Sequence, residues 1–216
     1  MTALYVWIDD RVPRRRATGR PPVLSDAELL TAAVAQALLQ VVSERRWLRL
    51  ITKRLPGMFP ALPRQPGYNK RLRAAGALLT RVMRDLARDT TFWHDDVWLA
   101  DSTPVGCGTS RETVHRSDLA GYAQYGYCAS HSRWFWGLRL HLICTPAGLP
   151  GQWILADKGY QRREFAHQLT DHGLQLLIPA GVCVRVAQRL LALTAAIWHN
   201  DHTGQPVTRS LIAYDH

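Results

Sequence analysis

The chain has 216 residues and 47% of them are hydrophobic, which is enough for one large domain or two small ones with a packed core. Its four cysteines are widely spaced without a Cys-x-x-Cys pair, which argues against a zinc knuckle and against a secreted disulfide framework. Because it has no apolar run of the ~18 residues that span a membrane and no signal-peptide pattern, we expect a cytoplasmic protein without membrane contact.

The net charge of +10 is concentrated in the first part of the chain. Residues 1–94 hold 17 Lys and Arg against 7 Asp and Glu, whereas residues 95–216 hold 10 of each. A basic segment ahead of a charge-balanced one suggests a polyanion-binding part followed by a part that acts on a phosphate ester. The competing interpretation is a solvated, arginine-rich surface without a partner.

The first ninety residues predict a basic arm and three helices. The arm spans residues 11–20 and contains Arg14, Arg15 and Arg16, in a form suited to phosphate contact or minor-groove insertion. Ser25 and Glu28 form a capping-box pattern that opens a helix over residues 26–41.

The second predicted helix opens at Ser43 and has one apolar and one basic face. The apolar face carries Trp47, Leu48, Ile51 and Leu55, and the other face carries Arg45, Arg46, Arg49, Lys53 and Arg54. A proline-rich link over 60–67 precedes a third helix that runs to about residue 89. Three helices with basic outer faces resemble a helix-turn-helix-like DNA-binding unit, with a helical cap on the second domain as the alternative.

Two apolar runs in the second half each stop at a carboxylate. Residues 97–100 precede Asp101, and residues 153–156 precede Asp157, which Lys158, Gly159 and Tyr160 follow. If these runs are neighbouring buried strands, the two carboxylates meet at one sheet edge, where hard oxygen ligands suit Mg²⁺. Each Asp alone could equally be a turn former or a helix N-cap.

The remaining elements complete an α/β pattern. Residues 122–130 and 133–145 predict two strands of a hairpin, the second with alternating Leu138, Leu140 and Leu142 opposite Arg139, His141 and Ile143. His141 is a candidate phosphate contact, although a lone histidine on a strand is more often structural. A helix over 161–172, a short strand over 174–178 and a long apolar helix over 182–200 follow.

Several of these runs together resemble bacterial insertion-sequence transposases of the DDE type, in the insertion-sequence nine-eighty-two group. The runs in the second half are Asp101-Ser-Thr-Pro104, Tyr125-Gly-Tyr-Cys-Ala-Ser130, Trp136-Gly-Leu-Arg-Leu-His141 and Leu155-Ala-Asp-Lys-Gly-Tyr160. Residues 43–49 and 65–71 match the N-terminal part of the family, and residues 187–193 and 209–216 match its C-terminal end. The resemblance covers nearly the whole chain.

This resemblance implies a ribonuclease-H-like catalytic domain that holds two Mg²⁺ or Mn²⁺ ions for attack on a phosphodiester. Asp101 maps to the first metal ligand and Asp157 to the second, and Lys158 and Tyr160 would touch the DNA backbone. The implied partner is double-stranded DNA, namely the terminal repeats of the element, and a homodimer would be compatible with it.

The chain departs from the family pattern in two places. The Glu-bearing helix that supplies the third ligand is missing, and neither Glu112 nor Glu164 matches its motif. Only the seven residues 146–152 link the third strand to the strand that ends at Asp157, whereas a parallel crossover takes a dozen or more. The pattern indicates two internal deletions and an impaired catalytic site.

The sequence therefore predicts an α/β protein with a basic helical DNA-binding part over 1–94 and an incomplete ribonuclease-H-like mixed sheet with flanking helices over 95–216. The expected function is that of an insertion-sequence transposase that binds element DNA and is impaired in cleavage. The alternatives are a non-catalytic DNA-binding remnant that inhibits an intact transposase, and a subunit that completes the site of another chain.

Overall fold

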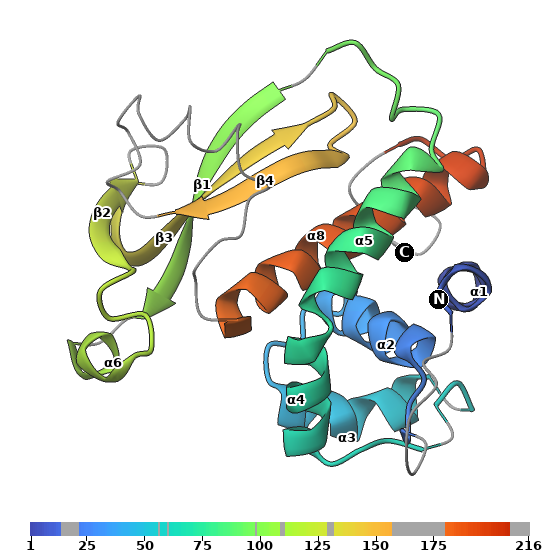
Figure 1. Ribbon diagram of the computed structural model, residues 1–216, viewed down its shortest axis with the longest axis horizontal. Helices are drawn as coiled ribbons and strands as arrows, with labels where there is room; N and C mark the ends of the chain where they lie inside the picture. Colours follow the sequence, from blue (N-terminus) through green and yellow to red (C-terminus); the bar gives the residue numbers. More distant parts are fainter. Residues whose placement is uncertain are drawn as a thin grey trace. The chain divides into compact units, whose positions relative to one another are not determined.

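The structure is a computed structural model, and it describes residues 1–13, 22–55, 57–59, 61–97, 99–108, 111–128, 132–156 and 180–207. The chain divides into two compact units (Figure 1). Unit 1 comprises Met1–His94 and Val184–His216, and unit 2 comprises Asp95–Cys183. The fold is thus a mixture of a helical part that includes the N-terminus and a part built on a sheet.

Unit 1 contains the helices α1 (Thr2–Arg11), α2 (Asp26–Leu38), α3 (Glu44–Arg54), α4 (Gln65–Ala74), α5 (Gly76–Arg88) and all but the first turn of α8 (Ala180–His202). The predicted capping box is confirmed, because the Ser25 hydroxyl accepts from the Glu28 amide at 3.1 Å and the Glu28 carboxylate accepts from the Ser25 amide at 2.6 Å. These two bonds satisfy amide donors that would otherwise lack partners at the first turn of α2.

Two helix predictions differ from the structure. The first helix ends at Leu38, three residues early, and Gln40 adopts the left-handed conformation with φ 53°. The third helix is two helices, because the chain bends at Ala75 and Gly76 between α4 and α5. Glycine weakens a helix interior, and here its bare backbone lies close to Val184, since an added Cβ would be 3.5 Å from the Val184 Cγ2.

The core of unit 1 is formed around α2 and α8. In α2 the buried residues run almost without a break from Ala27 to Gln36, and α8 buries residues including Leu191, Ala196 and Ile197. The sequence analysis assigned residues 184–216 to the second domain, yet the structure groups them with the first helices. The physical reason is burial, because α8 covers apolar surface that α1 and α2 leave open.

The length and apolar composition of α8 would also allow it to cross a membrane. Residues 181–202 pass that test, but 67% of the apolar window is buried inside the protein. A mostly buried apolar helix is what the core of a soluble helical domain requires.

A second set of contacts ties α1, α5 and α8 together at Asp89. The indole Nε1 atoms of Trp7 and Trp198 donate to one Asp89 oxygen at 2.7 and 3.0 Å, and the same oxygen lies 3.6 Å from His202. Burial alone raises the pKa of Asp89, but the bonds from Trp198 and Trp7, with the charges of Arg11 and His202, outweigh it and lower the pKa. The carboxylate therefore remains charged and joins the three helices through these contacts.

Unit 2 contains β1 (Leu99–Gly108), α6 (Arg111–Arg116), β2 (Gln124–Cys128), β3 (Arg133–Cys144) and β4 (Pro150–Ala156). The long strand β3 is central and pairs antiparallel with each of the other three strands. β1 pairs with the residues 136–144 of β3, so β2 and β4 occupy the opposite edge, β2 along 133–137 and β4 along 139–144. All ladders among the described residues are antiparallel, in place of the mixed sheet expected.

The strand pairing corrects the expected position of Asp101. The first strand was predicted to end at Ala100, but β1 continues to Gly108, and Asp101 is its third residue, opposite Leu142. The expected neighbours are also wrong, because β3 lies between β1 and β4. The seven residues after Thr145 are too few for a parallel crossover, and instead they close an antiparallel β3–β4 hairpin, with Thr145 and Leu149 hydrogen-bonded across the turn.

Candidate nucleic-acid interface

Helix α3 has one buried face and one exposed, basic face. Glu44, Trp47 and Ile51 are buried, and the last two are 0% exposed. The side chains of Arg45, Arg46, Arg49 and Lys53 are exposed on the other face, as the spacing predicted. The Ser43 hydroxyl caps the helix by accepting from the Arg46 amide at 3.3 Å.

The basic residues of α3 form a stripe along one side of the helix. Arg45, Arg49 and Lys53 follow one another at four-residue steps, so they span eight residues, or about 12 Å of helix. The major groove of B-DNA is about 12 Å wide and admits an α-helix. We call Arg45, Arg46, Arg49 and Lys53 the α3 basic face.

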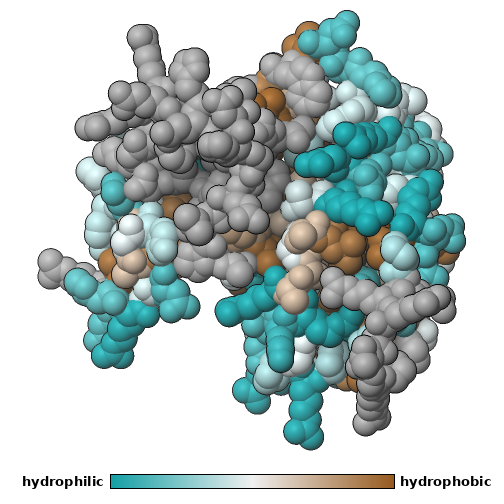
Figure 2. Space-filling view, in the orientation of Figure 1, coloured by the Kyte–Doolittle hydropathy of each residue, from teal (hydrophilic) through white to brown (hydrophobic). Residues whose placement is uncertain are grey.

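Helices α2 and α3 follow one another directly in the chain. The buried helix α2 leads through the turn at residues 39–43 into α3, which is buried on one side and basic on the other. In helix-turn-helix DNA-binding proteins the second helix enters the major groove while the first supports it. Figure 2 shows hydrophilic side chains projecting from the end of unit 1 where α3 and α4 lie in Figure 1.

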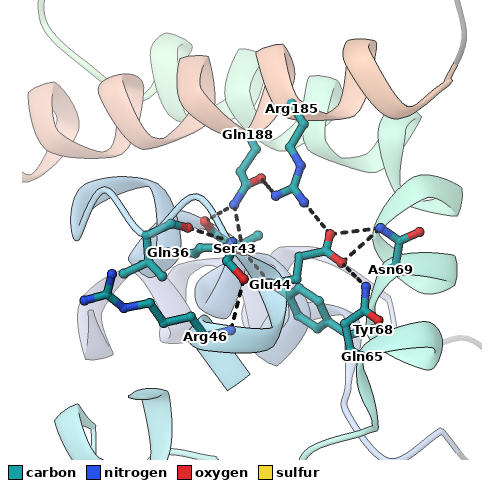
Figure 3. A network of polar contacts seen from close by, with 11 residues as sticks. Gln36, Ser43, Glu44, Arg46, Gln65, Tyr68, Asn69, Arg185 and Gln188 are labelled. Carbon is teal, nitrogen blue, oxygen red and sulfur yellow. Dashed lines mark hydrogen bonds and ion pairs between the residues drawn. The ribbon is translucent and has the colours of Figure 1, made fainter. Parts of the chain in front are cut away.

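The buried carboxylate of Glu44 anchors the first turn of α3 to two other helices (Figure 3). It accepts from the Asn69 amide nitrogen at 2.9 and 3.0 Å, from the Gln65 side chain at 3.2 Å and from the Arg185 guanidinium at 2.5 Å. Asn69 and Gln65 belong to α4, and Arg185 belongs to α8. A buried charge is tolerated only when it is paired and hydrogen-bonded, and these three partners meet that need.

The cluster continues from Arg185 into the centre of unit 1. Arg185 donates to the Gln188 carbonyl oxygen at 3.2 Å, and Gln188 donates to the Ala33 carbonyl at 2.7 Å and to Gln36 at 3.3 Å. Gln36 in turn donates to the Val41 carbonyl in the α2–α3 turn at 2.9 Å. The cluster therefore fixes both the turn and the first turn of α3, so the basic face is held on a rigid support.

The Tyr68 side chain lies at one end of this cluster, and its hydroxyl stays protonated. Its ring is 0% exposed, and its hydroxyl donates to Gln36 at 3.5 Å. Burial first, and the nearby Glu44 charge second, raise the pKa of Tyr68 well above its usual value. The hydroxyl accordingly stays a donor at any physiological pH.

Sequence reasoning did not single out the residues of this cluster. Glu44, Gln65, Asn69 and Gln188 lie in the three segments 43–49, 65–71 and 187–193 that carry the family resemblance, and Arg185 lies just before the last. The three segments meet in space, although residues 44 and 185 are 141 positions apart.

Of the two expected metal ligands, Asp101 lies among the described residues and Asp157 lies outside them. Asp101 lies opposite Leu142, and Ala156, the last described residue of β4, lies opposite Arg139 on the far edge of β3. β1 and β4 therefore lie two strand spacings apart, about 9.6 Å, with β3 between them. No group of three or more His, Cys, Asp or Glu that could hold a metal occurs among the described residues.

Several predicted site residues lie outside the described residues, namely Asp157, Lys158 and Tyr160 of the second motif and Arg14, Arg15 and Arg16 of the basic arm. The predicted helix over 161–172 and strand over 174–178 lie outside them as well.

His141 lies on β3 opposite Ser102 and Ile154 and is partly buried. Burial, and then the neighbouring Arg139, lower its pKa, so it is neutral near pH 7 and a weak phosphate ligand.

Comparison of the chain with protein-family models, with curated proteins and with solved structures gives no match.

Proposed function

We propose that this protein binds double-stranded DNA through its helical unit, with α3 in the major groove. The observation that carries the proposal is the α3 basic face, a set of four exposed cations on one side of the helix. The opposite side of α3 is fixed to the rest of unit 1 by the buried side chains of Glu44, Trp47 and Ile51. A rigid helix with cations on its outer side meets the two needs of groove docking, which are position and phosphate neutralisation.

The charge of unit 1 supports a polyanionic partner. Its residues include 20 Lys and Arg against 9 Asp and Glu, an excess of 11, whereas unit 2 has 7 against 8. Adding α8 to the first helices thus leaves all of the positive excess in the unit that carries the basic face. Such an excess attracts DNA at long range and makes the affinity strongly dependent on salt.

The resemblance to insertion-sequence transposases supports element DNA, in particular terminal repeats, as the target and the bacterial cytoplasm as the location. We propose that the protein is a transposase relative that binds such DNA without cleaving it, and so competes with an intact enzyme.

The described part of unit 2 does not fit the implied ribonuclease-H-like two-metal site. β3 separates the two strands that should present neighbouring carboxylates, and the sequence lacks the Glu-bearing helix of the family. We therefore assign no step to Mg²⁺ or Mn²⁺.

The test of DNA binding is fluorescence anisotropy with a 30-base-pair labelled duplex over a series of salt concentrations. The double variant Arg45→Ala/Arg49→Ala should lower affinity at least tenfold and reduce the slope of log K against log salt by about 2, since each phosphate contact contributes about 0.9. The matched control is Arg116→Ala, an exposed arginine of α6 in the other unit, which should change neither quantity.

An unchanged affinity and slope in the double variant would remove α3 as the contact surface. The absence of cleavage is tested separately with a supercoiled plasmid and Mg²⁺ or Mn²⁺. Nicking that disappears in Asp101→Ala would show that the protein cleaves DNA and that the competitor role is wrong.

A further inference from the structure

Helices α4 and α5 expose five cations along one side. These cations are Lys70, Arg73, Arg81, Arg84 and Arg88. The two helices follow one another with only Ala75 between them (Figure 1), and they contain a single acidic residue, Asp85. We call the five cations the α4–α5 basic face.

Helical spacing places these cations on a common side of both helices. The exposed residues follow one another at steps of three or four along the whole path, which runs through Lys70, Arg73, Ala77, Arg81, Arg84 and Arg88. Because an α-helix has 3.6 residues per turn, steps of three and four return to the same side. The bend at Ala75 does not interrupt this spacing.

The buried side of α4 and α5 follows the same rule and fixes the direction of the cations. Its residues are at most 6% exposed and also follow one another at steps of three or four, namely Tyr68, Leu72, Ala75, Leu79, Val82 and Leu86. This row packs into the core of unit 1, so the opposite side of both helices faces out of the unit. The outward direction of the α4–α5 basic face is therefore set by packing.

The α4–α5 basic face places like charges close together. Lys70 and Arg73 are three residues apart, and Arg84 lies within four residues of both Arg81 and Arg88. Like charges at these spacings repel and weaken a helix, and an ordinary protein surface mixes both signs. Arg73 and Arg84 have no ion pair among the described residues. A partner with many negative charges would offset this repulsion.

Asp85 neutralises only part of this charge. Its carboxylate lies 3.5 Å from Arg81, and the two side chains are 37% and 57% exposed. An exposed pair of this kind is screened by solvent, so the other four cations keep their full positive potential.

The α4–α5 basic face begins beside the first turn of α3. Asn69 donates to the Glu44 carboxylate at 2.9 and 3.0 Å (Figure 3), and Lys70 and Arg45 are the next residues of the two helices. The 18 residues from Lys70 to Arg88 cover about 27 Å along the helix axes. A DNA duplex carries one phosphate per about 1.7 Å of its axis, so a path of this length passes about 16 phosphates.

We propose that the α4–α5 basic face binds the phosphate backbone of the same duplex that α3 contacts, beyond the groove that α3 occupies. The proposal rests on the DNA-binding function above and adds a second set of contacts to it. Guanidinium groups suit this role because each can donate to two phosphate oxygens at once. Backbone contacts carry no base sequence information, so this face supplies affinity and position along the duplex.

The experiment measures binding of the full chain to a labelled 30-base-pair duplex by anisotropy over a series of salt concentrations. Arg73→Gln/Arg84→Gln removes one cation from each helix, and it should weaken binding about tenfold and lower the slope of log K against log salt by about 2. Arg73→Lys/Arg84→Lys keeps both charges and should retain most of the slope. The matched control is Arg116→Gln/Arg189→Gln, which removes the same charge from exposed arginines of α6 and α8 and should leave the slope nearly unchanged.

The two proposals fail in different ways. Unchanged affinity and slope in Arg73→Gln/Arg84→Gln, together with the expected loss in Arg45→Ala/Arg49→Ala, would overturn the α4–α5 basic face and leave the proposed function standing. The reverse pattern would keep the α4–α5 basic face as a duplex contact and remove α3. If both faces hold one duplex, the four substitutions together should lower the slope by about 4.

Two further outcomes would overturn the proposal. Two differently labelled duplexes that the parent protein brings together, and that Arg73→Gln/Arg84→Gln does not, would show that this face holds a second duplex. A polyglutamate chain that the parent protein binds more tightly than the duplex, and that the same variant does not bind, would show that the partner is an acidic protein. Circular dichroism of each variant, with Arg73→Lys/Arg84→Lys as the conservative comparison, separates loss of binding from loss of fold.

Discussion

Replacing Glu44 by Ala removes the carboxylate that joins α3, α4 and α8, and should destabilise unit 1. The Glu44 side chain is 6% exposed and accepts bonds from three residues. Removing one partner of a fully buried ion pair costs about 3–5 kcal/mol. Since the Arg185 side chain is 39% exposed and can regain water, we expect a smaller loss of about 2–3 kcal/mol in the free energy of unfolding. The isosteric Glu44→Gln keeps one acceptor and should cost about 1 kcal/mol.

The assay is urea unfolding followed by circular dichroism at 222 nm, which reports mainly on the helices of unit 1. A double-mutant cycle with Arg185→Met should give a coupling energy of about 1–2 kcal/mol. The matched control is the Arg81–Asp85 pair on α5, 3.5 Å apart with side chains 57% and 37% exposed, for which we expect at most about 0.5 kcal/mol. A Glu44–Arg185 coupling no larger than that of the surface pair would refute the claim that the cluster holds α3 in place.

Two further predictions concern the sheet and the Asp89 cluster. Gly137→Ala should unfold or severely weaken unit 2, because the added Cβ would lie 2.0 Å from the Val105 carbonyl oxygen. Gly106 pairs with Gly137 in the β1–β3 ladder, and no atom lies within 4 Å of a Cβ added to it, so Gly106→Ala should leave the stability of unit 2 nearly unchanged. Hydrogen exchange of the β1 and β3 amides compares the two variants. Asp89→Asn should destabilise unit 1 at neutral pH. The pKa of Asp89 in the folded protein is lowered from the ordinary value of 3.8. The carboxylate therefore contributes fully to the free energy of unfolding above that value, and this contribution is lost as the pH falls through the folded pKa. The urea midpoints of Asp89→Asn and the parent protein should therefore differ by a constant amount above about pH 5 and converge in acid; a gap that persists in acid would contradict this.

Local patterns in the sequence predicted the start of α2 and the two faces of α3, but they did not predict α1 (Thr2–Arg11). The capping box at Ser25 and Glu28 and the two faces of α3 follow from residues a few positions apart, and capping and helical spacing act over that range. The break at Ala75 between α4 and α5 was missed, since the apolar periodicity continues across it.

The same local patterns could not predict the order of the strands in the sheet. The hydrophobic runs identified β3 and β4, but their partners follow from which edge of β3 each strand occupies. The sequence analysis interpreted the short link over residues 146–152 as an internal deletion in a parallel crossover, whereas the structure has an antiparallel hairpin there, with Thr145 and Leu149 hydrogen-bonded across the turn.

The sequence by itself determined the basic face of α3, the position of its helix start and the surplus of positive charge, because composition and short-range periodicity encode them. Only the tertiary structure decided that Glu44, Asn69 and Arg185 form one cluster, that α8 belongs with the first helices and that Tyr127 and Trp134 share an exposed face. These features depend on contacts between residues far apart in the chain or on the register between strands, and no local pattern specifies either.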